Sequence, residues 1–165
     1  MPDLTRRKLI RTAALAAAAG TTFPTARTGA ADITLPSMPG AYMAIARYEL
    51  TPAFPGIPLI SYATTHGGMV YLAGVTADPR ELGDVKDQTR KILARIDALL
   101  ATAGTDKSKI LSAQVWLTDM GLFAAHNDAW NEWVDRKSPP VRACLLSPQL
   151  WRPGMLVEIM VTAAK

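Results

Sequence analysis

The stretch "GDVKDQTRKILARIDALLATAG", residues 83–104, carries the strongest structural signal in the sequence. Its apolar and small side chains recur every three to four residues, which predicts a helix with one buried face. The recurring positions are Val85, Thr89, Ile92, Leu93, Ile96, Leu99, Leu100 and Ala103. Asp84 fits the N-cap position, and Gly104 fits the residue that ends the helix. One face of this helix must therefore cover a second layer of structure.

Strand-like segments lie on both sides of this helix. "GGMVYLAGV" (67–75) precedes it, and "ILSAQVWLTDM" (110–120), "VRACLL" (141–146) and "MLVEIMVTA" (155–163) follow it. A second helix is predicted over "LFAAHNDAWNEWV" (122–134), where Phe123, Asn127, Trp130 and Trp133 or Val134 recur, and Pro139 and Pro140 end it. "ARYEL" (46–50) is a candidate edge strand.

This order predicts an α+β two-layer domain, a mixed sheet with two helices on one face. The last strand is apolar at almost every position, so we expect its second face to be covered as well, by oligomerisation.

The amino terminus has the layout of an export signal. "TRRKLIRTAALAAAAG" (5–20) places a twin arginine before a short apolar run, and "TARTGAAD" (25–32) supplies small residues for cleavage. An amphipathic helix is the alternative. The apolar run is too short to span a bilayer, so no membrane segment is expected after removal of the signal. We predict a twin-arginine signal peptide over residues 1–31, a proline-rich segment with the possible edge strand over 32–60, and a main domain with both predicted helices over 61–165. Residues 32–165 together form one mature domain, for which we predict a periplasmic location.

The basic charge of the chain has a local origin. Five of the 18 lysines and arginines lie in residues 1–31, against one of the 14 acidic residues, so the rest of the chain holds 13 of each. A neutral domain lacks the standing positive surface that a nucleic-acid backbone requires, and no nucleic-acid partner is expected. The single cysteine and two histidines have no partners at metal-ligand spacing, so a metal site is not expected.

Two charges interrupt apolar strands: Arg142 in "KSPPVRACLLS" (137–147) and Glu158 in "LVEIMV" (156–161). A buried charge needs a partner, and two interpretations stay open. In one, the two side chains pair with each other. In the other, Arg142 binds a substrate carboxylate and Glu158 orients or deprotonates a water molecule. Cys144 is more typical of a packed apolar residue than of a nucleophile, and His66 on a turn and His126 on a helix are expected at the surface or as caps.

Taken in order, "GGMVYLAG", residues 83–104, "VWLTDMGLFAAHNDAW", "PPVRAC" and "LVEIMV" resemble the reactive intermediate deaminases, the Rid, YjgF or L-PSP family. The resemblance runs from about residue 61 to residue 164. It implies a chorismate-mutase-like fold, a homotrimer with active sites between subunits, and no cofactor. The implied activity is hydrolysis of enamines and imines such as 2-aminoacrylate to 2-keto acids and ammonia.

The resemblance also implies roles for single residues. Arg142 would grip the substrate carboxylate, Glu158 would serve the attacking water, and both count as catalytic. The further substrate-binding positions it implies are Gly74, Cys144, Ala73, Tyr62 and Asn127. Ala73 replaces the family's serine, Val75 stands where glutamine is common, Tyr62 is offset from the usual aromatic, and a residue is inserted around "SPQLWRPG". Two other function classes stay open: an endoribonuclease, because the family has carried that label, and a non-catalytic module that binds or senses a small carboxylate.

Overall fold

The computed structural model describes residue 40 and residues 44–165 except residue 53. The predicted export signal and the first part of the proline-rich segment lie outside the described residues. Contacts define one compact unit over Ser37–Lys165. Among the described residues, neither helix combines the length and apolarity that crossing a bilayer requires.

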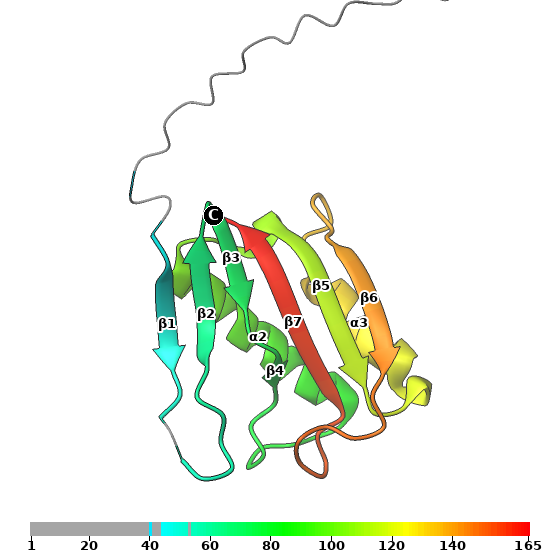
Figure 1. Ribbon diagram of the computed structural model, residues 1–165. Coiled ribbons are helices and arrows are strands. Elements are labelled where there is room, and N and C mark those ends of the chain that lie inside the picture. The colour runs from blue at the N-terminus through cyan, green and yellow to red at the C-terminus, as the bar shows by residue number, and fades with distance from the viewer. Residues whose placement is uncertain (1–39, 41–43, 53) are drawn as a thin grey trace, which may run out of the picture. The chain divides into compact units, whose positions relative to one another are not determined.

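A mixed, seven-stranded sheet forms one layer of the domain (Figure 1). Its strands are β1 (Ala46–Leu50), β2 (Ser61–His66), β3 (Met69–Leu72), β4 (Val75–Thr76), β5 (Ile110–Leu117), β6 (Val141–Leu146) and β7 (Val157–Ala164). They are ordered β1-β2-β3-β7-β5-β6, and β4 also pairs with β7. Only β5 and β6 run parallel, and the other pairs are antiparallel. β1 and β6 are therefore the edges of the sheet, as "ARYEL" predicted for β1.

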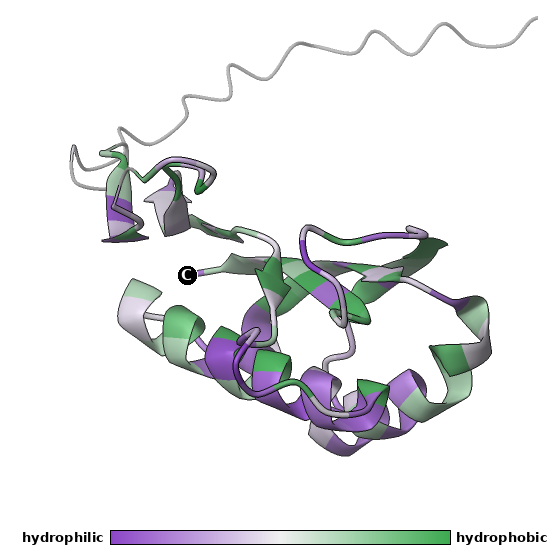
Figure 2. Cartoon of the chain, turned by 90° about the horizontal axis from the view of Figure 1, so that it is seen from below, coloured by the Kyte–Doolittle hydropathy of each residue, from purple (hydrophilic) through white to green (hydrophobic). Residues whose placement is uncertain are grey.

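Two α-helices of the described residues, α2 (Val85–Ala103) and α3 (Phe123–Trp133), cover one face of the sheet (Figure 2). Short 3-10 turns, η1 (Lys107–Lys109) and η2 (Met120–Leu122), precede β5 and α3. This confirms the α+β two-layer prediction. The opposite face of the sheet, called the open face below, carries no helix of the described chain.

Helix α2 forms as predicted. The Asp84 side chain accepts a hydrogen bond from the Asp87 backbone N–H at 2.9 Å, and Gly104 ends the helix with φ +83°. All eight recurring positions are buried. Each large aliphatic side chain buried in this way contributes about 1.5–3 kcal/mol, which makes α2 the main cover of the core.

Helix α3 forms where expected, but its buried face differs from the prediction. The buried residues are His126, Ala129 and Trp130, whereas Phe123 is 40% exposed. His126 was expected at the surface and is fully buried instead. It occupies a position on the apolar stripe at i, i+3, i+4 spacing with Ala129 and Trp130.

Strand β2 was not predicted, because its Ser/Thr-rich segment lacks an apolar run. It forms a hairpin with β3 through Gly67 and Gly68, both at positive φ, so His66 ends a strand rather than lying on a turn. Strand β7 buries every second residue under the helices and leaves the others half-buried on the open face. The single chain therefore covers one face of β7, not both.

The predicted strand over residues 67–75 is divided into β3 and β4. Tyr71 pairs with Thr162 and Val75 with Ile159, so four steps along β3–β4 match three along β7. The extra residue is a β-bulge at Ala73–Gly74, and the Ala73 backbone N–H donates instead to Tyr62 O at 3.0 Å.

Candidate functional site

Arg142 lies on edge strand β6 and points toward the helix layer. Its Nη1 donates to Asn127 Oδ1 on α3 at 2.9 Å, and its guanidinium carbon lies 4.9 Å from the centre of the Trp130 ring. Asn127 therefore joins helix α3 to the sheet through Arg142. Amide and indole hold the guanidinium by one hydrogen bond and one cation–π contact, and neither group neutralises its charge.

The rest of the guanidinium lacks partners. Nε and Nη2 of Arg142 are buried and form no hydrogen bond within the described chain, and burial lowers the pKa of the group. Leaving buried donors on a cation unpaired is costly. Two adjacent N–H groups on a planar cation match the two oxygens of a carboxylate, so this arrangement suits a carboxylate ligand.

His126 packs behind this group as a neutral side chain. Its Nδ1 lies 2.9 Å from Thr89 Oγ1, while the Thr89 hydroxyl is 2.7 Å from Val85 O. Because the single hydroxyl proton is taken by that carbonyl, Nδ1 must carry a proton and donate to Thr89. Burial, and then the charge of Arg142, lowers the pKa of His126 to about 4. His126 Nε2 is left as a buried acceptor without a partner in the described chain.

Glu158 meets Gly74 on the open face of the sheet. A Cβ added to Gly74 would lie 1.9 Å from Glu158 Oε1, so the carboxylate rests directly over the glycine α-carbon. Only a residue without a side chain permits this approach. Burial raises the pKa of Glu158, and no hydrogen bond or ion pair of the described residues offsets that effect. The candidate site thus has two polar groups: Arg142 with its contacts on the helix side, and Glu158 with the bulge at Gly74 on the open face.

Arg142 and Glu158 lie on opposite faces of the sheet. Arg142 is aligned with Ala113 on β5, which is buried under the helices, whereas Glu158 is paired with Trp116, three residues further along β5. Side chains alternate between faces along a strand, so an odd separation puts them on opposite sides. The hypothesis that the two side chains pair within one chain is therefore wrong.

Of the remaining predicted residues, Cys144 is grouped with Arg142 and Ala73 with Gly74, whereas the Tyr62 ring packs toward Arg95. Cys144 shares the helix-side face with Arg142, packs against the core, and has its thiol pKa raised mainly by burial, so it is not an activated nucleophile. Ala73 forms the bulge next to Gly74. The Tyr62 ring lies 5.4 Å from the Arg95 guanidinium of α2, and its carbonyl accepts from Ala73.

Two hydrogen-bonding groups were missed by the sequence analysis, one next to the register partner of Glu158 and one on the buried face of α2. The Trp151 indole N–H donates to Thr76 Oγ1 at 3.2 Å, and Thr76 is the register partner of Glu158. The buried amide of Gln88 bonds to the backbone of Gly83, Gly154 and Leu156. Gln88 could have been found as a polar residue on the buried stripe of α2, whereas no sequence pattern marks the Thr76–Trp151 contact.

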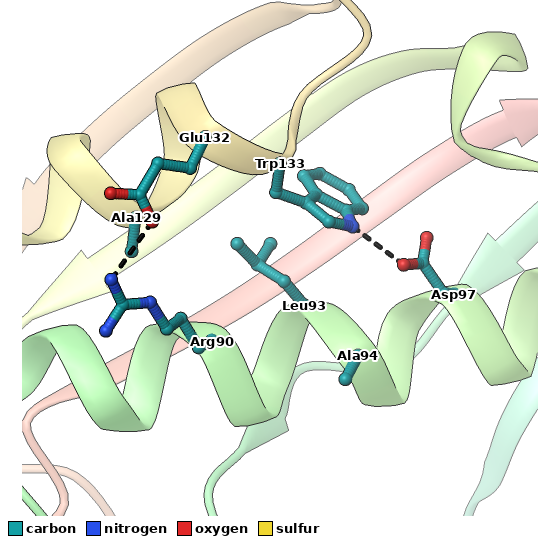
Figure 3. Close-up of a pocket in the computed structure, with 7 residues that line it drawn as sticks. All are labelled: Arg90, Leu93, Ala94, Asp97, Ala129, Glu132 and Trp133. Atoms are coloured by element: carbon teal, nitrogen blue, oxygen red, sulfur yellow. Dashed lines mark hydrogen bonds and ion pairs between the residues drawn. The ribbon is translucent and has the colours of Figure 1, made fainter.

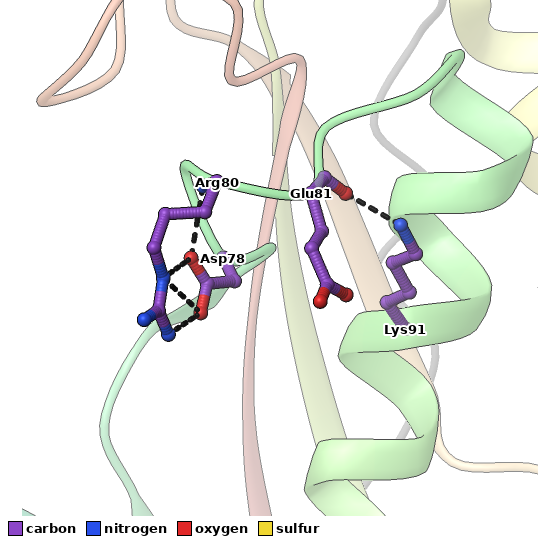
Figure 4. A network of polar contacts seen from close by, with 4 residues as sticks. All are labelled: Asp78, Arg80, Glu81 and Lys91. Atoms are coloured by element: carbon purple, nitrogen blue, oxygen red, sulfur yellow. Dashed lines mark hydrogen bonds and ion pairs between the residues drawn. The ribbon is translucent and has the colours of Figure 1, made fainter.

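The loop between β4 and α2 is held by its own polar contacts (Figure 4). Arg80 Nε donates to Asp78 at 2.9 Å, and the Lys91 ammonium donates to the Glu81 carbonyl. These contacts fix the path of the chain from the β4 end of the site to the start of α2.

A hollow of about 190 Å³ lies between α2 and α3, on the side away from the sheet's open face (Figure 3). Its polar groups already pair with each other: Arg90 with Glu132 at 3.0 Å, and the Trp133 indole with Asp97 at 2.8 Å. The contacts across this hollow join the two helices, and they leave none of the polar groups named here free for a ligand. Within residues 44–52 and 54–165, no three His, Cys, Asp or Glu side chains gather as a metal site would require.

Comparison with known proteins gives consistent matches. The family model described as "Endoribonuclease L-PSP" matches residues 56–165. A RutC family protein of Haemophilus influenzae is 40% identical over 104 residues, which cover 63% of this chain and 89% of that protein. The RutC family protein YoaB of Escherichia coli is 42% identical over 100 residues, covering 60% and 84%.

Solved structures agree with these matches. A member of the YjgF protein family from Neisseria meningitidis superposes with a TM-score of 0.66 and 36% identity, covering 75% of this chain and 97% of that one. A Rid family protein of unknown function from Yersinia pestis gives 0.65 and 29%, covering 74% and 100%. The fold, the order of motifs and the matched residues thus lead to one conclusion: the chain belongs to the endoribonuclease L-PSP family, also called YjgF or Rid.

Proposed function

We propose that this protein is a hydrolytic deaminase that converts reactive enamines and imines of 2-aminoacrylate type to 2-keto acids and ammonia. The observation that carries the proposal is the guanidinium of Arg142, whose buried Nε and Nη2 have no partner in the described chain. A small imino acid has the carboxylate that these two donors lack.

We further propose that the working site is built from two copies of the chain in a homotrimer. Arg142 and Glu158 of one chain lie on opposite faces of its sheet, so a single cleft can contain both only if they come from different copies. Edge strand β6 exposes Val141 at 74% and Leu145 at 48%, which supports burial of this strand against a neighbour. Closed cyclic assembly would then repeat the same cleft at each interface.

In the proposed reaction, Arg142 holds the substrate carboxylate while a water molecule attacks the carbon of the C=N bond. The new C–O bond forms as the π electrons of C=N move to nitrogen, which takes up a proton. The resulting carbinolamine then releases ammonia as its hydroxyl proton is removed, leaving the 2-keto acid. Glu158 of the neighbouring copy would take the proton from water and return it to the leaving nitrogen. Burial raises the pKa of Glu158, which makes this carboxylate a stronger base toward water than an exposed one.

The direct test supplies imino acids from an amino-acid oxidase and measures the imine left for trapping by semicarbazide. Wild type should reduce semicarbazone formation, and Arg142→Ala should not. Arg136→Ala, which removes an exposed arginine elsewhere, is the matched control. Equal protection by wild type and Arg142→Ala would refute the role of Arg142.

The two-copy site has its own test. Arg142→Ala and Glu158→Ala chains, each inactive alone, are unfolded together and refolded at equal ratio. Random trimers would restore about one quarter of the sites, because each intact site needs one chain of each kind in the right order. A mixture that stays inactive while forming trimers would mean that both residues act within one chain's site.

We also propose export to the periplasm by the twin-arginine route, on the basis of Arg6, Arg7 and the apolar run that follows. Residues 1–31 fused to a folded reporter should direct it to the periplasm. Replacing both arginines by lysine should retain the reporter in the cytoplasm, and unchanged export would refute the assignment.

A further inference from the structure

We infer that Trp151 is a specificity-determining residue, and that it favours imino acids with large apolar side chains, aromatic or branched. This inference rests on the proposed function and concerns the Glu158 end of the same site.

Trp151 is anchored beside Glu158. Its indole N–H donates to Thr76 Oγ1 at 3.2 Å, and Thr76 is paired with Glu158 between β4 and β7. Directly opposite residues of antiparallel strands share a face, with Cβ atoms about 4.5–5.5 Å apart. The indole therefore lies one side chain away from the carboxylate on the open face.

The loop that presents Trp151 is firmly held. Leu150 is 8% exposed and Met155 only 2%, so both flanks of the loop are buried in the core. Gln88 Nε2 donates to Gly154 O at 2.9 Å, and its Oε1 accepts from the Leu156 N–H at 2.9 Å. Between these anchors, the Trp151 side chain remains 54% exposed. Because its loop is already held, this half-exposed aromatic side chain would lose little conformational freedom on contact with a ligand.

The carboxylate has a tryptophan in each direction across the sheet. Trp116 on β5 is the register partner of Glu158, and Leu145 on β6 is aligned with Trp116. Trp116 on one side and Trp151 beyond Thr76 on the other thus flank the carboxylate across the open face. A substrate whose reacting carbon lies at Glu158 would direct its side chain along one of these surfaces.

Arg152, rather than the Trp151 ring, is the alternative group that could contact the substrate side chain. Its guanidinium carbon lies 4.7 Å from the Trp151 ring centre, which occupies one face of the indole and leaves the other for a ligand. If the cation rather than the ring contacted the substrate, the preferred side chain would be acidic. We favour the ring, because it is the group that the Thr76 hydrogen bond orients toward Glu158.

The test compares imines made by amino-acid oxidases from phenylalanine, leucine, alanine and glutamate, using the semicarbazide assay. For Trp151→Ala, the ratio of kcat/KM for the phenylalanine imine to that for the alanine imine should fall about tenfold, through KM rather than kcat. Trp151→Phe keeps an aromatic ring but loses the indole N–H that donates to Thr76, and Thr76→Val removes the acceptor, so each should lower the ratio by a similar amount and by less than Trp151→Ala. Trp133→Ala, which removes a tryptophan from the helix layer, should leave the ratio unchanged. Melting curves establish that each variant is folded.

The outcomes separate the two proposals. If wild type hydrolyses the alanine imine and Trp151→Ala keeps the same ratio, the role of Trp151 is wrong and the proposed function stands. If wild type hydrolyses none of the imines, the proposed function fails, and this inference fails with it. If the glutamate imine is preferred and Arg152→Ala abolishes that preference, Arg152 is the determinant and the inference is overturned.

Discussion

Gly74→Ala tests the close approach between the β-bulge and Glu158. The added Cβ would lie 1.9 Å from Glu158 Oε1 and 2.9 Å from its carboxyl carbon, whereas ordinary contact begins near 3.4 Å. The carboxylate must therefore withdraw by about 1.5 Å, and a misplacement of this size in a catalytic group costs about 10²-fold in rate. Gly74 is not at positive φ, and its new neighbour is the end of a flexible side chain. The free energy of unfolding should consequently change by less than about 1 kcal/mol.

The assay is imine hydrolysis together with a urea unfolding curve for each protein. Gly121→Ala is a matched control, because its Cβ would lie 3.2 Å from Asp119 Oδ1, a comparable methyl beside a carboxylate away from Glu158. A folded Gly74→Ala protein with undiminished kcat/KM would show that the position of the Glu158 carboxylate does not matter for turnover. Lost activity accompanied by a large loss of stability would instead show that the bulge serves folding.

Three further predictions follow from single groups. Asn127→Asp should place a carboxylate where Oδ1 now accepts from Arg142, so KM for the imino acid should rise at least about tenfold while the melting temperature rises. Because burial raises the pKa of Glu158, ionisation of this carboxyl lowers the stability of the folded protein at pH values above the ordinary glutamate pKa of 4.5. Glu158→Gln should therefore melt higher than wild type at pH 7.5, and the difference should disappear as the pH falls to 4.5. Burial lowers the pKa of His126 from 6.5 to about 4, so the free energy of unfolding of wild type should fall by up to about 3 kcal/mol as the pH drops between these values. Urea unfolding at pH 7.5 and 4.5 should show this loss in wild type and in His66→Gln, and no such loss in His126→Gln.

Elements that depend on local pattern could be predicted from the sequence. The caps and the eight buried positions of α2 are fixed within one continuous stretch, and the apolar runs of β5, β6 and β7 are equally self-contained. Strand β2 could not be found in this way, since its side chains gain their burial from α2 and from neighbouring strands rather than from their own polarity pattern. The same reason explains the error over His126, a polar residue made internal by its hydrogen bond to Thr89.

Sequence patterns did not predict which residues of the candidate site lie together in the fold. Arg142, Glu158, Gly74 and Asn127 were all identified by residue type and motif, and the structure brings them together as two pairs, Arg142 with Asn127 and Glu158 with Gly74. Which pairs form depends on strand register, because a shift of one residue moves a side chain to the other face. Register is set by contacts distant in the sequence, so the separation of Arg142 from Glu158 became visible only in the folded chain.

The Gln88 amide has a consequence for how the activity of this protein should be interpreted. It uses two donors and an acceptor to join the start of α2 to the segments around Gly83 and Gly154. An amide does not titrate, unlike a carboxylate or an imidazole in the same position. The frame around Glu158 therefore keeps its anchor across the whole pH range in which the domain stays folded. A pH profile of turnover would then report the ionisation of the reacting groups, because the Gln88 hydrogen bonds themselves do not change with pH.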